Sequence, residues 1–153
     1  MGKYEEKAKA LFLEGYNCSQ AVFLAFADLT GIDERSAALI ASSFGGGMGR
    51  MREVCGAVTG MFMVAGLLWG YDDPKAKEPK AAHYALVQEL AAEFRAECGS
   101  IVCRELLDNS ADTGSVPTER TAEFYKKRPC AELVGLAAHI LEKHIEKNGG
   151  ETL

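Results

Sequence analysis

The chain has 153 residues, of which 48% are hydrophobic, 25% are charged and only 4 are proline, a composition typical of a globular protein that buries a core without disulfide staples. Its formal net charge of −5 argues against a nucleic-acid partner, because binding to phosphate backbones needs a surface rich in Lys and Arg. The first residues, MGKYEEKAKALFLEG, lack the basic and apolar segments of a signal peptide. We therefore expect a cytoplasmic protein with neither a nucleic-acid nor a membrane partner.

Apolar residues recur at helical spacing along nearly the whole chain, and no segment alternates in the manner of a half-buried strand. A polar linker at 71–79 and a loop at 108–118 interrupt the pattern. The predicted fold class is therefore all-α: a compact single-domain bundle of about six helices over residues 1–153, with a frayed tail at 146–153. The predicted helical segments are, in chain order, 3–14, 18–30, 34–44, 51–70, 80–98, 101–107 and 129–148.

Residues with known preferences for helix ends mark several of these boundaries. Asn17 and Asp33 are good N-cap residues, because their side-chain oxygens accept hydrogen bonds from the first free backbone N–H groups of a helix. Pro129 is a preferred first helical residue. Gly15 and Gly31 are expected to end the first two helices.

Residues 54–70 carry no charge, and within them Gly56 and Gly60 form a GxxxG pair of the kind that associates helices in lipid. This run is at the short limit for a membrane-spanning helix, which needs about 17–25 residues. A helix that is apolar on all sides is also expected at the centre of a bundle. We favour the buried helix and keep a membrane-associated helix as the lesser alternative.

The glycine-rich segment FGGGMGR precedes this helix and exposes backbone N–H groups near its positive end. It lacks the Lys-Ser/Thr pair of a P-loop, the spacing of the dinucleotide-binding fingerprint and a preceding strand, so the sequence does not support a nucleotide site. A tight loop beside Cys55 fits better. The candidate cofactor-binding residues, through their backbone groups, are Gly45, Gly46, Gly47 and Gly56.

Four of the five cysteines lie where helices are predicted to begin, namely Cys18, Cys55, Cys103 and Cys130. Free N–H groups and the helix dipole favour an anion there, so we expect thiol pKa values below the ordinary value of about 8.5. A thiolate is the form that binds metals and takes part in disulfide exchange. Cysteine is also among the most buried residue types, and simple packing of the thiols in the core is an equal alternative.

The spacing of the cysteines excludes the familiar local motifs. No two of them form a CxxC pair, so thioredoxin-like, zinc-ribbon and ferredoxin arrangements are not supported. A four-cysteine site must therefore be assembled from four separate helices. Cys98 precedes Gly99 at the end of a predicted helix, where the dipole disfavours a thiolate, and we place it outside the site.

The arginines beside the glycine segment and the three histidines are further candidates for a site. Arg50 and Arg52 flank the glycine segment; we favour a solvated helix start, and the alternative is stabilisation of a thiolate or of an anionic substrate. His83, His139 and His144 each lie alone on a predicted helix, and a surface histidine is more common there than a metal ligand.

The segments NCSQAV, FGGGMGR…CGAVTG, GSIVCRELL and CAELVGLAAHIL together resemble the C_GCAxxG_C_C family, which is described as redox-active. The resemblance spans about residues 15–140. Its CGAxxG motif matches residues 55–60, and its other cysteines match Cys18, Cys103 and Cys130. The family is also similar to a segment of split-Soret-type cytochromes, in which a cysteine cluster is associated with an iron–sulfur centre. The CxxCH haem motif is absent from this sequence, so the resemblance implies no haem.

We therefore expect a redox-active or electron-transfer protein, either an oxidoreductase or an electron carrier, whose four matched cysteines meet in one pocket. They would bind an iron–sulfur cluster or a soft metal such as zinc, or they would cycle between dithiol and disulfide. Electron transfer implies a redox partner protein, and a glycine-rich buried helix is compatible with a homodimer. The alternative from another class is a non-enzymatic structural or binding module whose cysteines only pack.

Overall fold

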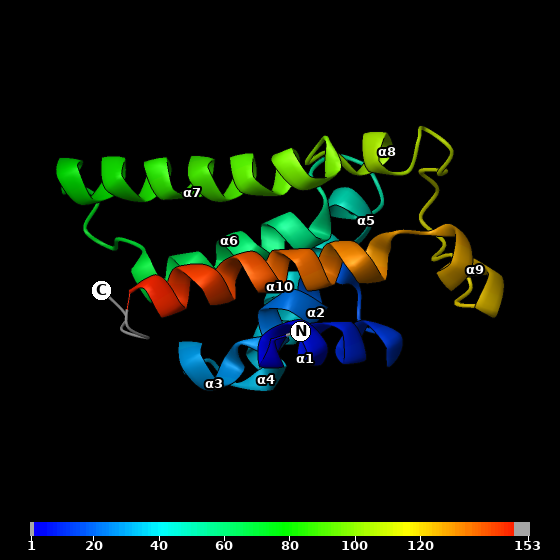
Figure 1. The fold of residues 1–153 in the computed structure, drawn as a ribbon, viewed down its shortest axis with the longest axis horizontal. Coiled ribbons are helices and arrows are strands. Elements are labelled where there is room, and N and C mark those ends of the chain that lie inside the picture. Colours follow the sequence, from blue (N-terminus) through cyan, green and yellow to red (C-terminus); the bar gives the residue numbers. More distant parts are fainter. Residues whose placement is uncertain (1, 149–153) are drawn as a thin grey trace.

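The computed structural model describes residues 2–148. In this range the backbone forms helices, loops and one isolated antiparallel bridge, between Val54 and Val102, so the predicted all-α fold class is confirmed. The elements shown in Figure 1 are, in chain order, α1 (Lys3–Leu13), α2 (Cys18–Ala25), α3 (Ala27–Thr30), α4 (Glu34–Ala41), the 3-10 helix η1 (Ser42–Phe44), α5 (Gly45–Met48), α6 (Gly56–Trp69), α7 (Lys77–Cys98), α8 (Cys103–Leu106), α9 (Ala122–Lys127) and α10 (Cys130–Lys147).

The predicted capping residues make the expected contacts. The Asn17 side chain accepts a hydrogen bond from the Gln20 backbone N–H at 2.8 Å, and the Gln20 side chain accepts one from the Asn17 N–H at 3.0 Å, which completes a capping box at α2. Asp33 accepts a hydrogen bond from the Ser36 N–H at 2.9 Å at the start of α4. Gly31 ends α3 in the left-handed conformation, as the sequence predicts.

Several helix boundaries differ from the prediction. The expected helix 18–30 is interrupted at Phe26, whose φ of −104° and ψ of 16° depart from helical values; its ring is fully buried and stacks on Tyr4 with 4.5 Å between ring centroids. The helix expected from residue 51 begins only at Gly56, because the preceding residues form a left-handed turn and then the bridge at Val54. Tertiary contacts therefore override local helix propensity at both places.

Two further differences lie in the second half of the chain. Helix α9 was not predicted, since its six residues are too few to display a helical period. Helix α10 continues through Lys147, so the first residues of the expected frayed tail at 146–153 are helical. Residues 149–153 of that tail lie outside the described residues.

Helix α2 lies at the centre of the fold and packs against α1, α4, α6 and α10. Its partner α6 is apolar on all sides and mostly buried. The glycine pair of α6 allows close approach, because a Cβ at Gly60 would lie only 2.7 Å from the Ser19 carbonyl oxygen and 3.0 Å from Val22 Cβ of α2. The predicted buried helix is thus present, and its first GxxxG pair mediates packing within the chain.

No helix among residues 2–148 combines the length and the hydropathy that crossing a bilayer demands. Helix α6, which contains most of the candidate apolar run, has 14 residues. Helix α7 contacts α6 and α10, and its buried residues Leu90, Ala91 and Phe94 lie in its second half. The short helices α5, α8 and α9 and the start of α10 lie toward one end of the molecule (Figure 1), and this end contains the candidate site.

Candidate functional site

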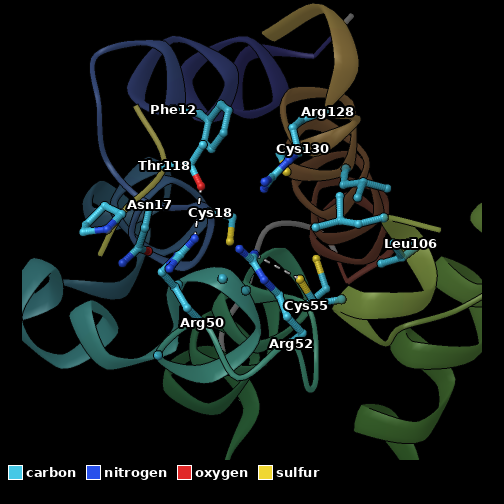
Figure 2. Close-up of a pocket in the computed structure, with 18 of the residues that line it drawn as sticks. Phe12, Asn17, Cys18, Arg50, Arg52, Cys55, Leu106, Thr118, Arg128 and Cys130 are labelled. Carbon is cyan, nitrogen blue, oxygen red and sulfur yellow. Dashed lines mark hydrogen bonds between the residues drawn. The ribbon is translucent and has the colours of Figure 1, made fainter. Parts of the chain in front are cut away.

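The structure brings the starts of four helices together around one cavity of about 320 Å³ (Figure 2). Each start supplies a cysteine. Cys18, Cys103 and Cys130 are the first residues of α2, α8 and α10, and Cys55 is the N-cap of α6. All four line the cavity and none is disulfide-bonded. Cysteines up to 112 positions apart in sequence thus share one site. We call Cys18, Cys55, Cys103 and Cys130 the four-cysteine set.

The isolated β-bridge positions two members of the set. Val54 pairs with Val102, so Cys55 and Cys103 directly follow the two bridge residues. The Cys55 N–H donates to the Ile101 carbonyl at 2.8 Å, and the Cys103 N–H donates to the Glu53 carbonyl at 2.6 Å. Backbone hydrogen bonds therefore fix both helix starts relative to one another. Sequence alone gave no signal for this bridge, since each paired stretch is too short for a period-two pattern.

Cys18 is positioned by close packing against a glycine. A Cβ at Gly56 would overlap the Cys18 sulfur and would lie 3.0 Å from the Ser19 nitrogen. Gly45 in turn lies against the Asn17 side chain, where a Cβ would approach within 2.5 Å. These contacts give a steric reason for two of the candidate glycines in the sequence.

The glycine segment forms a left-handed turn rather than an ordinary helix. Gly46 and Gly47 have φ values of 66° and 70°, and Met48 and Arg50 also have positive φ. This conformation favours glycine, and it is strained for the two side-chain-bearing residues. The Gly46 N–H donates toward the Cys18 sulfur, and a Cβ at Gly47 would lie 2.6 Å from Cys103 Cβ. The turn therefore contacts two members of the four-cysteine set through its backbone.

Arg50 and Arg52 point into the site instead of into solvent (Figure 2), so the preferred expectation of a solvated helix start is wrong for both. The Arg52 side chain is 5% exposed; its Nη1 lies 3.8 Å from the Cys103 sulfur, and its Nε donates to the Asp112 carbonyl at 2.8 Å. Arg50 donates to the Asp112 carboxylate at 2.8 Å and to Thr118 at 3.1 Å. The loop after α8 thus binds both guanidinium groups, and that of Arg52 lies beside the Cys103 sulfur.

Two further arginines that sequence reasoning missed also line the cavity. Arg120 donates to the Phe12 carbonyl at 2.9 Å and to the Tyr16 carbonyl at 3.0 Å, with its guanidinium carbon 4.2 Å from the centre of the Phe12 ring. Arg128 lies over the Phe124 ring at 5.1 Å and faces Cys130 (Figure 2). Only tertiary structure places these residues near the cysteines.

Burial determines the acidity of the thiols more strongly than their position at helix starts. Loss of water contact raises the pKa of Cys18, raises that of Cys55 well above its ordinary value and raises that of Cys130 to about 11. Neighbouring thiols add to the increase, whereas the Gly46 N–H at Cys18 and the positive charge of Arg128 at Cys130 oppose it. The expected lowering of the pKa is therefore wrong for these three thiols, because desolvation exceeds the stabilisation of the thiolate.

The four sulfur atoms lie around the cavity and are not all close to one another. The charges of Cys18, Cys103 and Cys130 each raise the pKa of Cys55, and Cys103 also raises that of Cys18 and of Cys130, so the four thiols lie within electrostatic range of one another. No three of the four sulfurs, however, lie all within 4.8 Å of one another. The arrangement is an open ring of soft donors with four arginines nearby.

The fifth cysteine lies outside this ring. Cys98 is the last residue of α7, and its thiol donates to the carbonyls of Phe94 at 3.1 Å and Ser100 at 3.3 Å. It is absent from the lining of the cavity. The structure thus agrees with its placement apart from the other four.

A family model described as "Putative redox-active protein (C_GCAxxG_C_C)" matches residues 16–144. The matched region includes the four-cysteine set and the CGAVTG segment at 55–60. The searches of curated proteins and of solved structures found no match.

Proposed function

Because the chain belongs to the C_GCAxxG_C_C family of redox-active proteins, we propose that its four-cysteine set binds an iron–sulfur cluster through which the protein transfers electrons. The observation that carries the proposal is the convergence of four thiols, from four helix starts, on one cavity. Four cysteine thiolates are the usual ligands of [2Fe–2S] and [4Fe–4S] clusters. When bound, such a cluster supplies a one-electron redox couple.

The charges around the cavity support an anionic occupant. Four ionised thiols at this spacing would repel one another, and burial already opposes their ionisation. A metal centre removes this conflict by displacing the thiol protons. Arg52 and Arg128, close to Cys103 and Cys130, are placed to compensate the remaining negative charge.

The spacing of the sulfurs favours a cluster of several metal ions over a single zinc ion. With Zn–S distances of about 2.3 Å, a tetrahedral zinc site needs sulfurs about 3.8 Å apart. No three sulfurs of the set meet even a 4.8 Å limit. A [4Fe–4S] cluster accepts more widely separated thiolates, because each of its four ligands binds a different iron.

A thiol–disulfide function is the second candidate, and one contact favours it. The Cys18 sulfur packs on Gly56, the residue that follows Cys55, and Cys18 is the thiol with the largest charge effect on Cys55. Oxidation of these two thiols would form one S–S bond and release two electrons and two protons to a disulfide or quinone acceptor. A redox partner protein is expected under either function.

Elemental analysis distinguishes these functions. The full chain is purified without oxygen, and iron, acid-labile sulfide and zinc are measured per chain together with the visible absorption spectrum. We expect matched iron and sulfide with a broad visible band, lost in Cys18→Ser, Cys55→Ser, Cys103→Ser and Cys130→Ser and retained in the control Cys98→Ser. Colourless, iron-free wild-type protein would contradict the cluster, and loss of two free thiols on mild oxidation would then favour the dithiol.

A further inference from the structure

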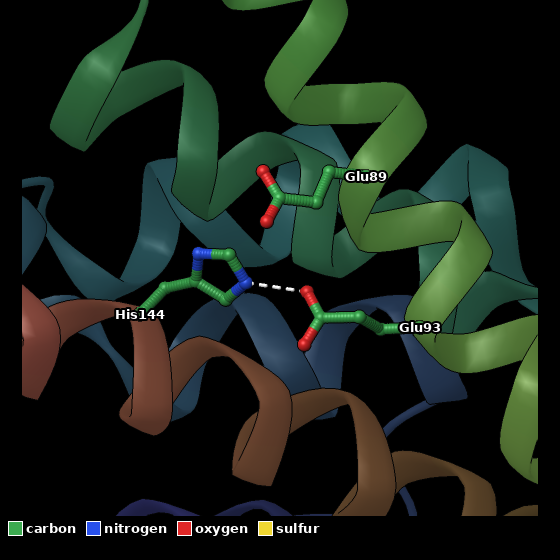
Figure 3. A group of neighbouring side chains, drawn as sticks. All are labelled: Glu89, Glu93 and His144. Atoms are coloured by element: carbon green, nitrogen blue, oxygen red, sulfur yellow. Dashed lines mark hydrogen bonds and ion pairs between the residues drawn. The ribbon is translucent and has the colours of Figure 1, made fainter.

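A second group of possible metal ligands lies between α7 and α10, away from the cysteines (Figure 3). It consists of Glu89 and Glu93 on α7 and His144 on α10. His144 follows Cys130 by 14 residues on the same helix, which is about 21 Å of axial rise. Any ligand bound here is therefore separate from the cavity described above.

The histidine of this group is buried. His144 is 9% exposed, so the expectation of a surface histidine is wrong at this position, whereas the side chain of His139 is 48% exposed and fits it. The His144 Nε2 lies 2.5 Å from a Glu93 carboxylate oxygen. The Nε2 atom of this buried imidazole thus faces α7, and water is largely excluded from its surroundings.

The two glutamates approach the imidazole from the same side. Glu89 and Glu93 are four residues apart on α7, so they project from one face of the helix. One donor atom from each residue, together with the His144 nitrogen, forms a set in which all distances are within 4.8 Å. Figure 3 shows the three side chains directed toward one another.

Within residues 2–148, only one of the two glutamates has a partner. Glu93 has Lys143 at 3.9 Å besides His144, and Glu89 makes no hydrogen bond or ion pair with any residue from 2 to 148. Two carboxylates directed at the same point repel each other unless a cation lies between them. One nitrogen and two carboxylate oxygens are donors that divalent first-row transition metals accept.

We propose that Glu89, Glu93 and His144 bind one divalent transition-metal ion, with water completing its coordination. Ligand distances of about 2.0–2.2 Å put neighbouring donor atoms about 2.8–3.1 Å apart in an octahedral site and about 3.3–3.6 Å apart in a tetrahedral one, so Glu93 must withdraw slightly from His144 to admit the ion. The exposed Glu89 gives the ion access from solvent. Because the donors are hard and borderline, this site selects different metals from the four thiols.

The bound ion would link α7 to α10 in addition to their packing contacts. Helix α7 is joined by a short loop to Cys103, the first residue of α8, and α10 begins at Cys130. An ion that binds only the folded chain also stabilises it. The site therefore has two independent readouts, metal binding and a shift in melting temperature.

Titration with Mn²⁺ tests the proposal, since this hard ion competes poorly for thiols. The full chain is treated with EDTA, desalted and titrated while EPR measures free Mn²⁺; wild type should bind one ion and melt at a higher temperature. Glu89→Gln and Glu93→Gln should weaken binding about tenfold or more and abolish the shift in melting temperature. The control Glu97→Gln, one turn beyond Glu93 on α7 and exposed like Glu89, should behave as wild type.

Glu89→Gln decides the outcome, because an exposed side chain without a described partner can change without disturbing the fold, as circular dichroism would verify. No binding of Mn²⁺ by wild type at millimolar concentration would overturn the proposal. Equal weakening by Glu97→Gln and Glu89→Gln would overturn it as well, since that result indicates general attraction to an acidic helix.

Discussion

Gly56 packs directly on the Cys18 sulfur, so the second residue of the CGAVTG segment makes room for a cysteine 38 positions earlier in the chain. The glycine is required by its neighbour and not by its own backbone, which is helical. The first glycine of the CGAVTG segment is thus needed for a contact between two helices, α2 and α6. This contact and the β-bridge at Val54 together hold three of the four cysteines around the cavity.

Replacement of Gly56 by alanine should displace Cys18. We expect Gly56→Ala to lower the free energy of unfolding by about 1–3 kcal/mol, as overpacking of a core does, and to reduce the iron content. Chemical denaturation and iron analysis measure the two effects. Gly66→Ala on the same helix is the matched control: no atom lies within 4 Å of its added Cβ, so it should leave stability unchanged or raise it by up to about 1 kcal/mol.

Arg52 should tune the redox potential of the proposed cluster. Its guanidinium lies 3.8 Å from the Cys103 sulfur and is buried, so it stabilises the more negative, reduced state. Arg52→Met should therefore shift the midpoint potential to a more negative value in an anaerobic dye-mediated titration. The control Arg35→Met, at an exposed residue of α4, should leave it unchanged. A shift to a more positive value would contradict this role.

The raised thiol pKa values predict a stability that falls in alkaline solution. Below about pH 8.5, thiols are protonated in both folded and unfolded chains, and their burial carries no ionisation penalty. As pH rises toward 11, an unfolded Cys130 loses its proton while the folded one, with a pKa of about 11, retains it, so the unfolded state gains up to about 2–3 kcal/mol from this residue.

Urea denaturation of metal-free protein at pH 7 and pH 10.5 measures this effect. The loss of unfolding free energy between the two pH values should be smaller in Cys130→Ala than in wild type. The control Cys98→Ala, with a less buried thiol, should resemble wild type more closely. Equal pH dependence in wild type and Cys130→Ala would show that this thiol titrates normally in the folded protein.

Arg120 should protect the cavity by fastening the segment before α9 to the end of α1. It donates to the Phe12 and Tyr16 carbonyls and stacks on the Phe12 ring. Arg120→Ala removes these contacts, and we expect faster loss of the visible absorption in air. The neighbouring exposed Lys126→Ala should bleach at the wild-type rate. Identical rates for both variants would contradict a protective contact.

The sequence predicts helices, their caps and the placement of the cysteines well, because these features depend on local patterns. Asn17 and Asp33 cap as expected, and all four matched cysteines occur at helix starts. Their acidity could not be predicted, since it depends on burial that only the assembled fold defines. Arg52, far from solvent beside Cys103, and His144, buried against α7, were misassigned for the same reason.

Native mass spectrometry of the anaerobically purified chain tests the central claim most directly, because it weighs the protein together with what it binds. We predict one species heavier than the polypeptide by the mass of a single iron–sulfur cluster, present in Cys98→Ser and absent when any one of Cys18, Cys55, Cys103 or Cys130 is replaced by serine. A wild-type species with the bare polypeptide mass, or lighter by two hydrogen atoms, would contradict the cluster.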